Sequence, residues 1–195
     1  MSKLPPLMYV TNRRLMGNGP ELVDTLRSAL WSLPPGSIMV YVREPDLEGL
    51  ALVELCRAFI PVVRDSSQRI VVRDRIDVAR FVGADGVQLP EESFTVSEAR
   101  KLWPGGLVGV SLHDPSAIPA DIDADFATLS PIFATETHPE AIPLGLDALR
   151  SAVVSTRCPL YALGGIDDSN AQATFATGVY GIAMMRTAWR AAAAL

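Results

Sequence analysis

The feature that most constrains the fold is a regular alternation of short apolar runs with amphipathic stretches. Eight runs rich in Val, Ile, Leu and Met cover residues 7–11, 38–42, 69–72, 86–89, 107–112, 125–129, 160–163 and 180–184. Between them, apolar residues recur at spacings of three and four, which is typical of helices with one buried face. Examples are Leu22, Leu26, Ala29 and Leu30, and Leu52, Leu55, Cys56 and Phe59. We therefore predict eight strands that alternate with helices.

The composition of the strands indicates a parallel sheet. Residues 38–42 read Ile-Met-Val-Tyr-Val, so both faces of this strand would be apolar, as expected where helices cover a parallel sheet. Strand starts recur at roughly 25-residue intervals, which is short but sufficient for a closed (β/α)8 barrel. We predict an α/β protein with a single short TIM barrel, and a doubly wound sheet is the alternative. The weakest predicted helices fall in residues 74–85 and in the Pro-rich stretch 114–124.

Length and charge limit the class of protein. The 195 residues fit one domain spanning 1–195. The formal net charge of −5 gives no broad basic field, so we expect no nucleic-acid partner. No apolar run approaches the roughly 18 residues that span a bilayer, and residues 1–6 lack the core of a signal peptide. We expect a cytoplasmic protein without a membrane partner, in which Cys56 and Cys158, each among apolar neighbours, are buried free thiols.

Polar residues gather after the predicted strands, where a barrel of this class keeps its catalytic groups. They are Thr11, Asn12, Arg13, Arg43, Glu44, Asp74, Arg75, Gln88, Glu91, Glu92, Ser111, His113, Ser130, Gly164, Gly165 and Arg186. A purely structural end of the barrel would not need such a convergence, although loops are polar in general.

The pair Gly164-Gly165 is the sharpest local signal. Loops after strands seven and eight are the usual phosphate site of this fold, and glycines let backbone amides approach an anion. Arg186 follows strand eight beside Met185, and its guanidinium could complement the charge of a phosphate. We therefore predict a phosphate site formed by Gly164, Gly165, Met185 and Arg186. The alternative for Arg186 is that it only solvates the start of the last helix.

Several ordered motifs together resemble the thiamine phosphate synthase and thiazole tautomerase (TenI) superfamily from residue 7 to about 188. They are Tyr-Val-Thr-Asn-Arg at 9–13, Val-Arg-Glu at 42–44, Asp-Arg-Ile-Asp-Val-Ala at 74–79, Val-Gly-Ala-Asp-Gly-Val-Gln-Leu at 82–89, Gly-Val-Ser-Leu-His at 109–113, Ser-Pro-Ile-Phe-Ala-Thr at 130–135, Leu-Gly-Leu at 144–146 and Ala-Leu-Gly-Gly-Ile at 162–166. The resemblance implies a (β/α)8 barrel that binds a thiazole phosphate. In the synthase, the barrel joins this molecule to a pyrimidine diphosphate with loss of magnesium pyrophosphate.

The resemblance also implies roles for single residues. Arg43, Ser111, Ser130 and Thr135 would bind substrate, and Glu44, in the Arg-Glu motif, would belong to the catalytic groups. Asp74 matches one magnesium ligand, and with Glu91 or Glu92 it could form an oxygen-rich site of the kind that Mg²⁺ prefers. We take Asp74 and Glu92 as the candidate metal ligands.

Five positions depart from the synthase pattern. Tyr41 stands where the synthase motif has Gln, Pro45 where it has Lys, Arg73 where it has Asn, Ser93 where it has an acidic metal ligand, and His138 where it has a pyrophosphate-binding Lys. Two ammonium groups and one carboxylate are thus missing from a mechanism dominated by electrostatics. We therefore expect synthase activity to be weak.

The tautomerase branch also lacks parts of the pyrophosphate site, and Gln88-Leu89-Pro90 with Ser93-Phe94-Thr95 is closer to that branch. It uses a histidine just after strand six, however, and this chain has Pro131 there. Only His113 and His138 can supply an imidazole, the side chain best suited to proton transfer near neutral pH. Both are candidate acid/base groups, and we assign the proton transfer to His138, because Pro131 cannot carry a proton and the loop over residues 134–143 could bring this imidazole over the pocket, whereas His113 could be structural.

Three classes of function stay open at this stage. The chain is an enzyme of the thiamine pathway, either a synthase with a rebuilt site or a tautomerase with a relocated proton carrier. It is otherwise a noncatalytic homologue that binds a phosphorylated ligand or regulates a partner, or a different phosphate-binding barrel such as a sugar-phosphate epimerase or isomerase, against which the ordered motifs count. The Ala-rich end, residues 188–195, would pack on its own barrel or against a second chain in a homodimer.

Overall fold

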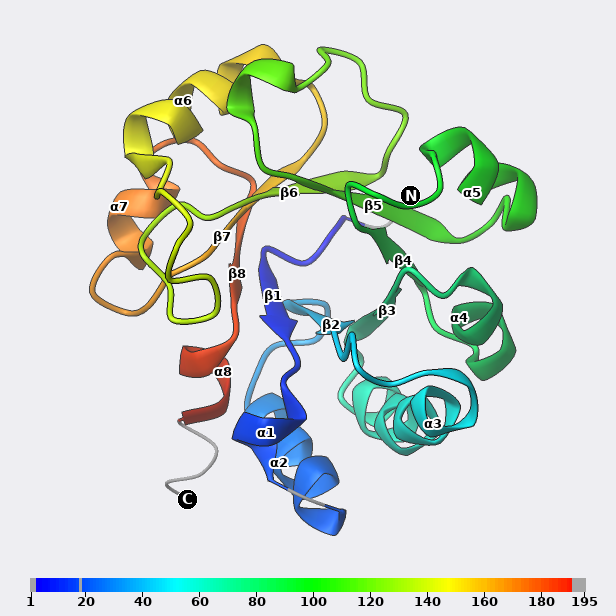
Figure 1. Ribbon diagram of the computed structural model, residues 1–195. Coiled ribbons are helices and arrows are strands. Elements are labelled where there is room, and N and C mark those ends of the chain that lie inside the picture. The colour runs from blue at the N-terminus through cyan, green and yellow to red at the C-terminus, as the bar shows by residue number, and fades with distance from the viewer. Residues whose placement is uncertain (1–2, 18, 191–195) are drawn as a thin grey trace.

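A computed structural model describes residues 3–17 and 19–190, and over these residues the strands form a closed parallel barrel (Figure 1). The strands pair in sequence order, and β1 pairs with β8 to close the sheet. Their bounds are β1 Leu7–Val10, β2 Ile38–Val42, β3 Arg69–Arg73, β4 Gly86–Leu89, β5 Leu107–Leu112, β6 Phe126–Leu129, β7 Leu160–Leu163 and β8 Gly181–Met184. The predicted TIM barrel is confirmed, and the doubly wound alternative is excluded because the sheet has no open edge.

Helices surround the strands on the outside of the barrel (Figure 1). Their bounds are α1 Arg13–Met16, α2 Pro20–Leu30, α3 Gly49–Asp65, α4 Ile76–Val82, α5 Val96–Leu102, α6 Gly145–Ser155, α7 Ala171–Phe175 and α8 Arg186–Arg190. The third connection, a weak helix prediction, does contain α4. The fifth contains only a 3₁₀ turn, Pro115–Ala117, and Pro119, which lacks a backbone N–H donor, follows too closely for a longer helix to form.

The two faces of each strand contribute to two separate hydrophobic clusters. Outward side chains such as Val40, Ile70 and Leu129 belong to the large core beneath the helices. Inward side chains form a separate cluster in the lumen, made of Met8, Val10, Met39, Tyr41, Val71, Phe126, Tyr161 and Ala183. Gly109 leaves room in this lumen, because a Cβ there would lie 2.3 Å from the Phe126 ring and 2.2 Å from Gln88 Oε1.

Aromatic side chains close the N-terminal end of the lumen. Phe126 and Tyr161 meet edge to face with ring centroids 5.8 Å apart, and Tyr161 also packs against Tyr180. The Tyr161 hydroxyl donates to the carbonyl of Pro5 and the Tyr180 hydroxyl to the carbonyl of Leu4, so both phenols are satisfied by the segment that precedes β1. Burial raises the pKa of Tyr161, which keeps the phenol neutral.

Other sequence expectations have mixed outcomes. Cys56 and Cys158 are buried and free as predicted, and burial raises the pKa of Cys56 to about 12 and that of Cys158 to about 11.

Within the described part of the chain, no helix is long and apolar enough to cross a bilayer. Of the Ala-rich end, Ala188 and Trp189 are buried in α8, whereas 191–195 lie outside the described residues. The homodimer stays a prediction.

Candidate active site

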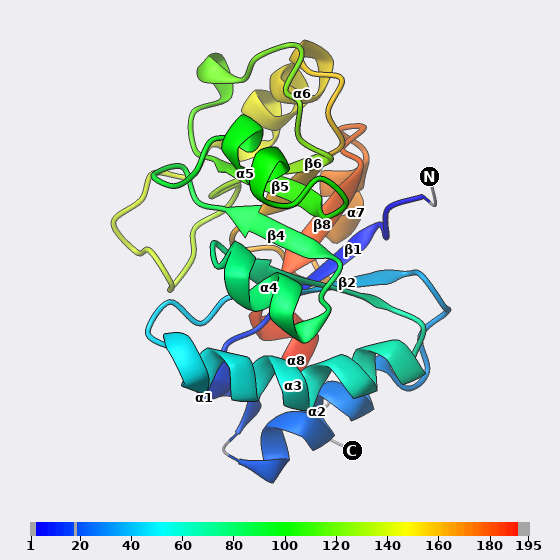
Figure 2. The same ribbon diagram turned by 90° about the vertical axis from the view of Figure 1, so that its right-hand side faces the viewer.

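A cavity of about 530 Å³ lies at the C-terminal ends of the strands. Its lining follows the inward phase of each strand, because alternate residues of a strand face the same side. Inward Tyr41 is followed two residues later by Arg43, Val71 by Arg73, Gln88 by Pro90, Ser111 by His113, Leu163 by Gly165 and Ala183 by Met185. The loop from β6 to α6 supplies much of the remaining wall, and it projects from the barrel on the side away from the N-terminus (Figure 2).

Ten of the thirteen residues predicted for the site line this one cavity. They are Arg43, Ser111, His113, Ser130, Thr135, His138, Gly164, Gly165, Met185 and Arg186. The three others, Glu44, Asp74 and Glu92, are not among the lining residues. The structure thus brings together the predicted substrate, phosphate and imidazole groups, and it leaves the predicted metal ligands outside them.

Glu44 is buried in a network that joins the ends of β1 and β2. Its carboxylate accepts from the Thr11 hydroxyl at 2.8 Å, from the Arg13 amide at 2.9 Å and from the Arg13 guanidinium at 3.1 Å. The Thr11 hydroxyl in turn accepts from the amide of Arg43 at 3.0 Å, which places Arg43 at the cavity wall. In this arrangement Glu44 positions its neighbours, and its catalytic role stays a prediction.

The candidate magnesium ligands are not gathered into a cage. Ser93 donates a hydrogen bond to the Asp74 carboxylate, and Glu92 is exposed. Over residues 3–17 and 19–190, no group of three or more His, Cys, Asp or Glu side chains has the proximity to hold a metal ion. Mg²⁺ is usually bound by one or two carboxylates together with water and substrate phosphates, so the magnesium site at Asp74 and Glu92 stays a prediction.

The two glycines after β7 are required by the fold itself. Gly164 has φ of 98° and Gly165 φ of 64°, conformations that favour glycine. A Cβ at Gly164 would lie 2.8 Å from the Cα of Pro131, and one at Gly165 would lie 2.4 Å from the carbonyl oxygen of Ala134. The glycines therefore let β7 approach the β6–α6 loop closely.

Arg186 lies across from this loop at the start of α8. Its guanidinium pairs with Glu136 at 3.1 Å, and its side chain is about one-third exposed. Because Glu136 also lines the cavity, its carboxylate occupies a position that an anionic ligand could take in its place.

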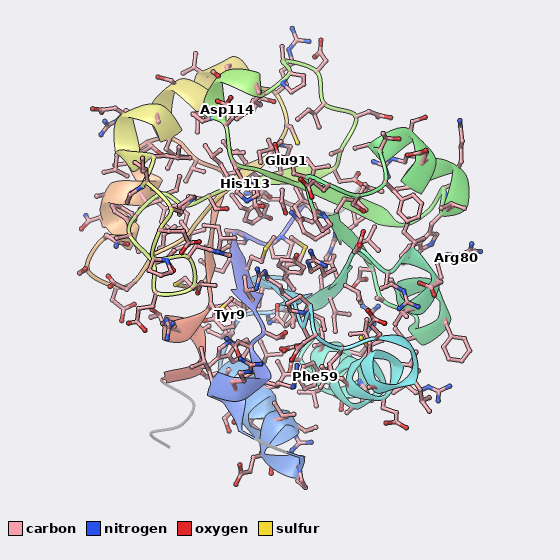
Figure 3. All side chains as sticks on the ribbon, viewed as in Figure 1. Tyr9, Phe59, Arg80, Glu91, His113 and Asp114 are labelled. Atoms are coloured by element: carbon pink, nitrogen blue, oxygen red, sulfur yellow. The ribbon has the colours of Figure 1, made fainter. Side chains whose placement is uncertain are left out.

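The two histidines differ in how firmly they are held. His113 Nδ1 lies 2.7 Å from the Glu91 carboxylate, a hydrogen-bond distance, and the two side chains lie side by side in Figure 3. His138 Nδ1 lies 3.7 Å from Glu140, which is an ion-pair contact without hydrogen-bond geometry. A carboxylate on Nδ1 orients an imidazole and leaves Nε2 for proton exchange, so His113 is the better prepared of the two.

A buried amide orients one hydroxyl of the cavity wall. Gln88 is fully buried, and its Nε2 donates to Ser111 Oγ and to Thr128 Oγ1, both at 3.1 Å. Because Ser111 Oγ accepts this bond, its own proton remains for donation into the cavity. Ser111 is thus prepared to donate to an acceptor on a ligand.

Two cavity residues, Tyr41 and Arg73, are not among the predicted site residues, because in the sequence they stand out only as departures from the synthase motif. Tyr41 is almost fully buried with its ring in the lumen cluster, and Arg73 lines the cavity beside it. Strand alternation would have found both, since Tyr41 and Arg43 share one face of β2 and Val71 and Arg73 one face of β3.

Comparison with known proteins agrees with this architecture. The family model described as thiamine monophosphate synthase matches residues 7–188. The chain is 38% identical over 183 residues to a putative thiamine-phosphate synthase 2 of Aquifex aeolicus, covering 93% of this chain and 96% of that protein. It is 34% identical over 182 residues to a thiamine-phosphate synthase of Moorella thermoacetica, covering 91% and 85%.

A solved structure gives the same result. The thiamine phosphate pyrophosphorylase from Pyrococcus furiosus superposes with a TM-score of 0.79 at 28% identity, over 95% of this chain and 91% of that one. The closed parallel barrel is therefore an architecture that this chain shares with a thiamine phosphate pyrophosphorylase. The chain belongs to the thiamine monophosphate synthase family and is a thiamine phosphate synthase-like protein of thiamine biosynthesis.

Proposed function

We propose that the cavity binds a thiazole phosphate, with the phosphate between Gly164-Gly165 and Met185-Arg186. The convergence of ten predicted residues on one cavity supports this assignment most strongly. Arg186 supplies a guanidinium that can make two hydrogen bonds to phosphate oxygens. Ser111, Ser130 and Thr135 line the same cavity and supply hydroxyls for the heterocycle.

The synthase reaction, which joins the thiazole phosphate to a pyrimidine diphosphate, is expected to be slow. It needs positively charged groups around the departing pyrophosphate, which is an anion. This chain has Pro45 and His138 where the family motif has lysines, and Ser93 where it has an acidic metal ligand. Removal of a single electrostatic group costs roughly 10² to 10³ in rate, so we expect coupling at least about a hundredfold slower than in a complete synthase.

Proton transfer on the thiazole ring, the tautomerase activity, is a second candidate, and the Glu91–His113 contact favours it. The carboxylate at 2.7 Å holds the imidazole at the cavity wall, where Nε2 can exchange a proton with a ligand. If His113 is the proton carrier, His113→Ala should lower the tautomerase rate by roughly 10² or more with little change in ligand affinity, whereas His138→Ala should not. The reverse order would assign the proton to His138, and a protein that binds without turnover would be a noncatalytic homologue.

Calorimetry tests the phosphate assignment itself. Thiazole phosphate should bind the parent protein, and the unphosphorylated alcohol should bind much more weakly. Arg186→Ala should weaken the phosphate form by about 1.5–3 kcal/mol, the usual range for hydrogen bonds to a charged group, and leave the alcohol nearly unchanged.

Arg150→Ala is the matched control, because Arg150 pairs with exposed Asp147 on α6 and does not line the cavity. Equal weakening of both ligands by Arg186→Ala would show that Arg186 shapes the cavity without binding phosphate. No binding of thiazole phosphate to the parent would refute the assignment.

A further inference from the structure

An ion pair crosses the cavity at its proposed phosphate end. The guanidinium of Arg186, the first residue of α8, lies 3.1 Å from the carboxylate of Glu136 in the β6–α6 loop, and both residues line the cavity (Figure 1). Within residues 3–17 and 19–190, Arg186 has no other ion-pair partner. In the ligand-free protein, the positive charge of the proposed phosphate site is therefore paired with a carboxylate of the same chain.

The segment 135–142, which carries Glu136, has few other polar ties to the barrel. Most of it is exposed, and in the part of the chain that the structure describes its other hydrogen bonds and ion pairs run between its own residues. The amide of Ala141, for example, donates to the carbonyl of His138. The Glu136 carboxylate can therefore leave Arg186 without breaking a network of further contacts.

A phosphate group is a stronger partner for Arg186 than this carboxylate is. The side chains of Glu136 and Arg186 are 75% and 34% exposed, and ion pairs in such contact with water contribute little to stability. A phosphate carries up to two negative charges and can meet the guanidinium fork with two hydrogen bonds. Two anions on one guanidinium would repel each other, so the phosphate has to take the place of the carboxylate.

We propose that Glu136 is a specificity-determining residue: its carboxylate is an internal competitor, which a ligand phosphate displaces from Arg186. A group tethered by a short flexible segment competes at an effective concentration on the order of millimolar. Every anion that uses Arg186 has to overcome this competition. The inference rests on the proposed function, because it takes Arg186 as the phosphate-binding residue.

The competition distinguishes ligands by what else they contact. Inorganic phosphate makes few contacts beyond Arg186, so the loss caused by Glu136 is a large part of its small binding free energy. A phosphorylated heterocycle also contacts the rest of the cavity and binds in spite of the same loss. Glu136 thus keeps the site closed to free phosphate ions and leaves it open to the phosphorylated ligand.

Calorimetry with three probes tests the competition. They are thiazole phosphate, inorganic phosphate and the unphosphorylated thiazole alcohol. Glu136→Gln removes the negative charge and keeps the shape of the side chain. We expect both phosphate probes to bind this variant about three- to tenfold more tightly than the parent, because no ion pair has to be broken and no like charge faces the phosphate. The affinity for the alcohol should stay within about 1.5-fold.

Glu140→Gln is the matched control. It makes the same change of charge in the same segment and at the same cavity, but the ion-pair partner of Glu140 is His138 and not Arg186. It should change phosphate affinity by less than about 1.5-fold, because charges that are exposed to water are screened. In an Arg186→Gln background, Glu136→Gln should no longer strengthen binding of thiazole phosphate, as a double-mutant cycle requires of two residues that act on each other.

Three results would overturn the inference: Glu136→Gln binds the phosphate probes no more tightly than the parent, Glu140→Gln strengthens them equally, or the gain persists without Arg186. Each of these, in a parent that binds thiazole phosphate, leaves the proposed function in place. If inorganic phosphate responds to Glu136→Gln as expected but thiazole phosphate binds neither protein, the competitor stands and the proposed function fails. If neither phosphate probe binds the parent or Glu136→Gln, both are refuted.

Discussion

The two ends of the barrel lumen differ in composition, because aromatic rings fill one end and mainly polar residues line a cavity at the other. At the N-terminal end, Phe126, Tyr161 and Tyr180 fill the space, and both phenols are bonded to the backbone of the segment before β1. At the C-terminal end, the same strands continue into arginines, hydroxyls, glycines and a histidine around a cavity of about 530 Å³. The lumen is thus tightly packed at one end, and the other end is free to vary its chemistry.

The largest expected effect is at the packed end. Phe126→Ala removes a fully buried ring from the lumen, and it should lower the free energy of unfolding by about 3–5 kcal/mol. Urea unfolding measures this loss. Thiazole phosphate affinity, measured well below the unfolding midpoint, should change little, because Phe126 does not line the cavity.

Trp31→Ala is the control for aromatic removal, since Trp31 is 81% exposed and should change stability by no more than about 0.5 kcal/mol. A Phe126→Ala protein that keeps its stability but loses ligand affinity would break the proposed division between the two ends.

A smaller effect is expected from a pair of glycines with similar backbones. Gly83 has φ of 75° with open space around it, so Gly83→Ala should cost only the left-handed penalty of about 1–2 kcal/mol. Gly165→Ala adds a 2.4 Å approach to the carbonyl oxygen of Ala134, and we expect a further 1–3 kcal/mol, as roughly seen for overpacking, together with weaker thiazole phosphate binding. Urea unfolding and calorimetry measure the two effects. If both variants lose the same free energy of unfolding, the β6–α6 loop moves to accommodate the added methyl group, and Gly165 does not shape the cavity.

The smallest effect concerns an ion pair at the cavity end. The Arg13 guanidinium lowers the pKa of Asp46 to about 2, from an ordinary value of 3.8. A carboxylate with a lowered folded-state pKa stabilises the fold above pH 3.8, and this contribution is lost as the pH falls towards 2. Asp46→Asn should therefore be less stable than the parent at pH 5, and the difference should shrink at pH 2.5. Urea midpoints at both pH values check this, and a difference that grows at low pH would contradict it.

The fold could be predicted from the sequence because each strand is an apolar run, and most of these runs are separated by amphipathic stretches with helical spacing. The errors lie at strand ends. Asp125 was expected in a strand, but its carboxylate instead accepts from the Val108 amide at 2.7 Å and from Arg100 at 2.8 Å, just before β6 begins. Tyr180 was also expected in a strand, and its hydroxyl bonds to Leu4 below the barrel. Whether such a residue belongs to a strand depends on its contacts with residues that are distant in the sequence. A local sequence pattern carries no information about these contacts.

The site was predicted less completely, for a reason that strand geometry explains. Arg43 and Glu44 both follow β2, yet only Arg43 shares the inward phase of Tyr41, and Glu44 is buried against Thr11 and Arg13. Likewise Arg73 faces the cavity and Asp74 does not line it. A list of polar residues after strands finds the right end of the barrel, whereas the phase of each strand is needed to select the side chains that reach a ligand. The contacts of Glu91, Glu136 and Ser93 join separate loops, so only the folded structure contains them.

A crystal structure with thiazole phosphate bound is the most direct test of the central claim. We predict the phosphate at Gly164-Gly165 with the Arg186 guanidinium turned from Glu136 towards it, and the heterocycle near Ser111 and Ser130. A phosphate held elsewhere in the cavity, with no ligand atoms at Gly164-Gly165, would contradict the placement of the phosphate beside the loops after β7 and β8. Crystals that show no ligand in the cavity at saturating concentration would contradict the proposed function.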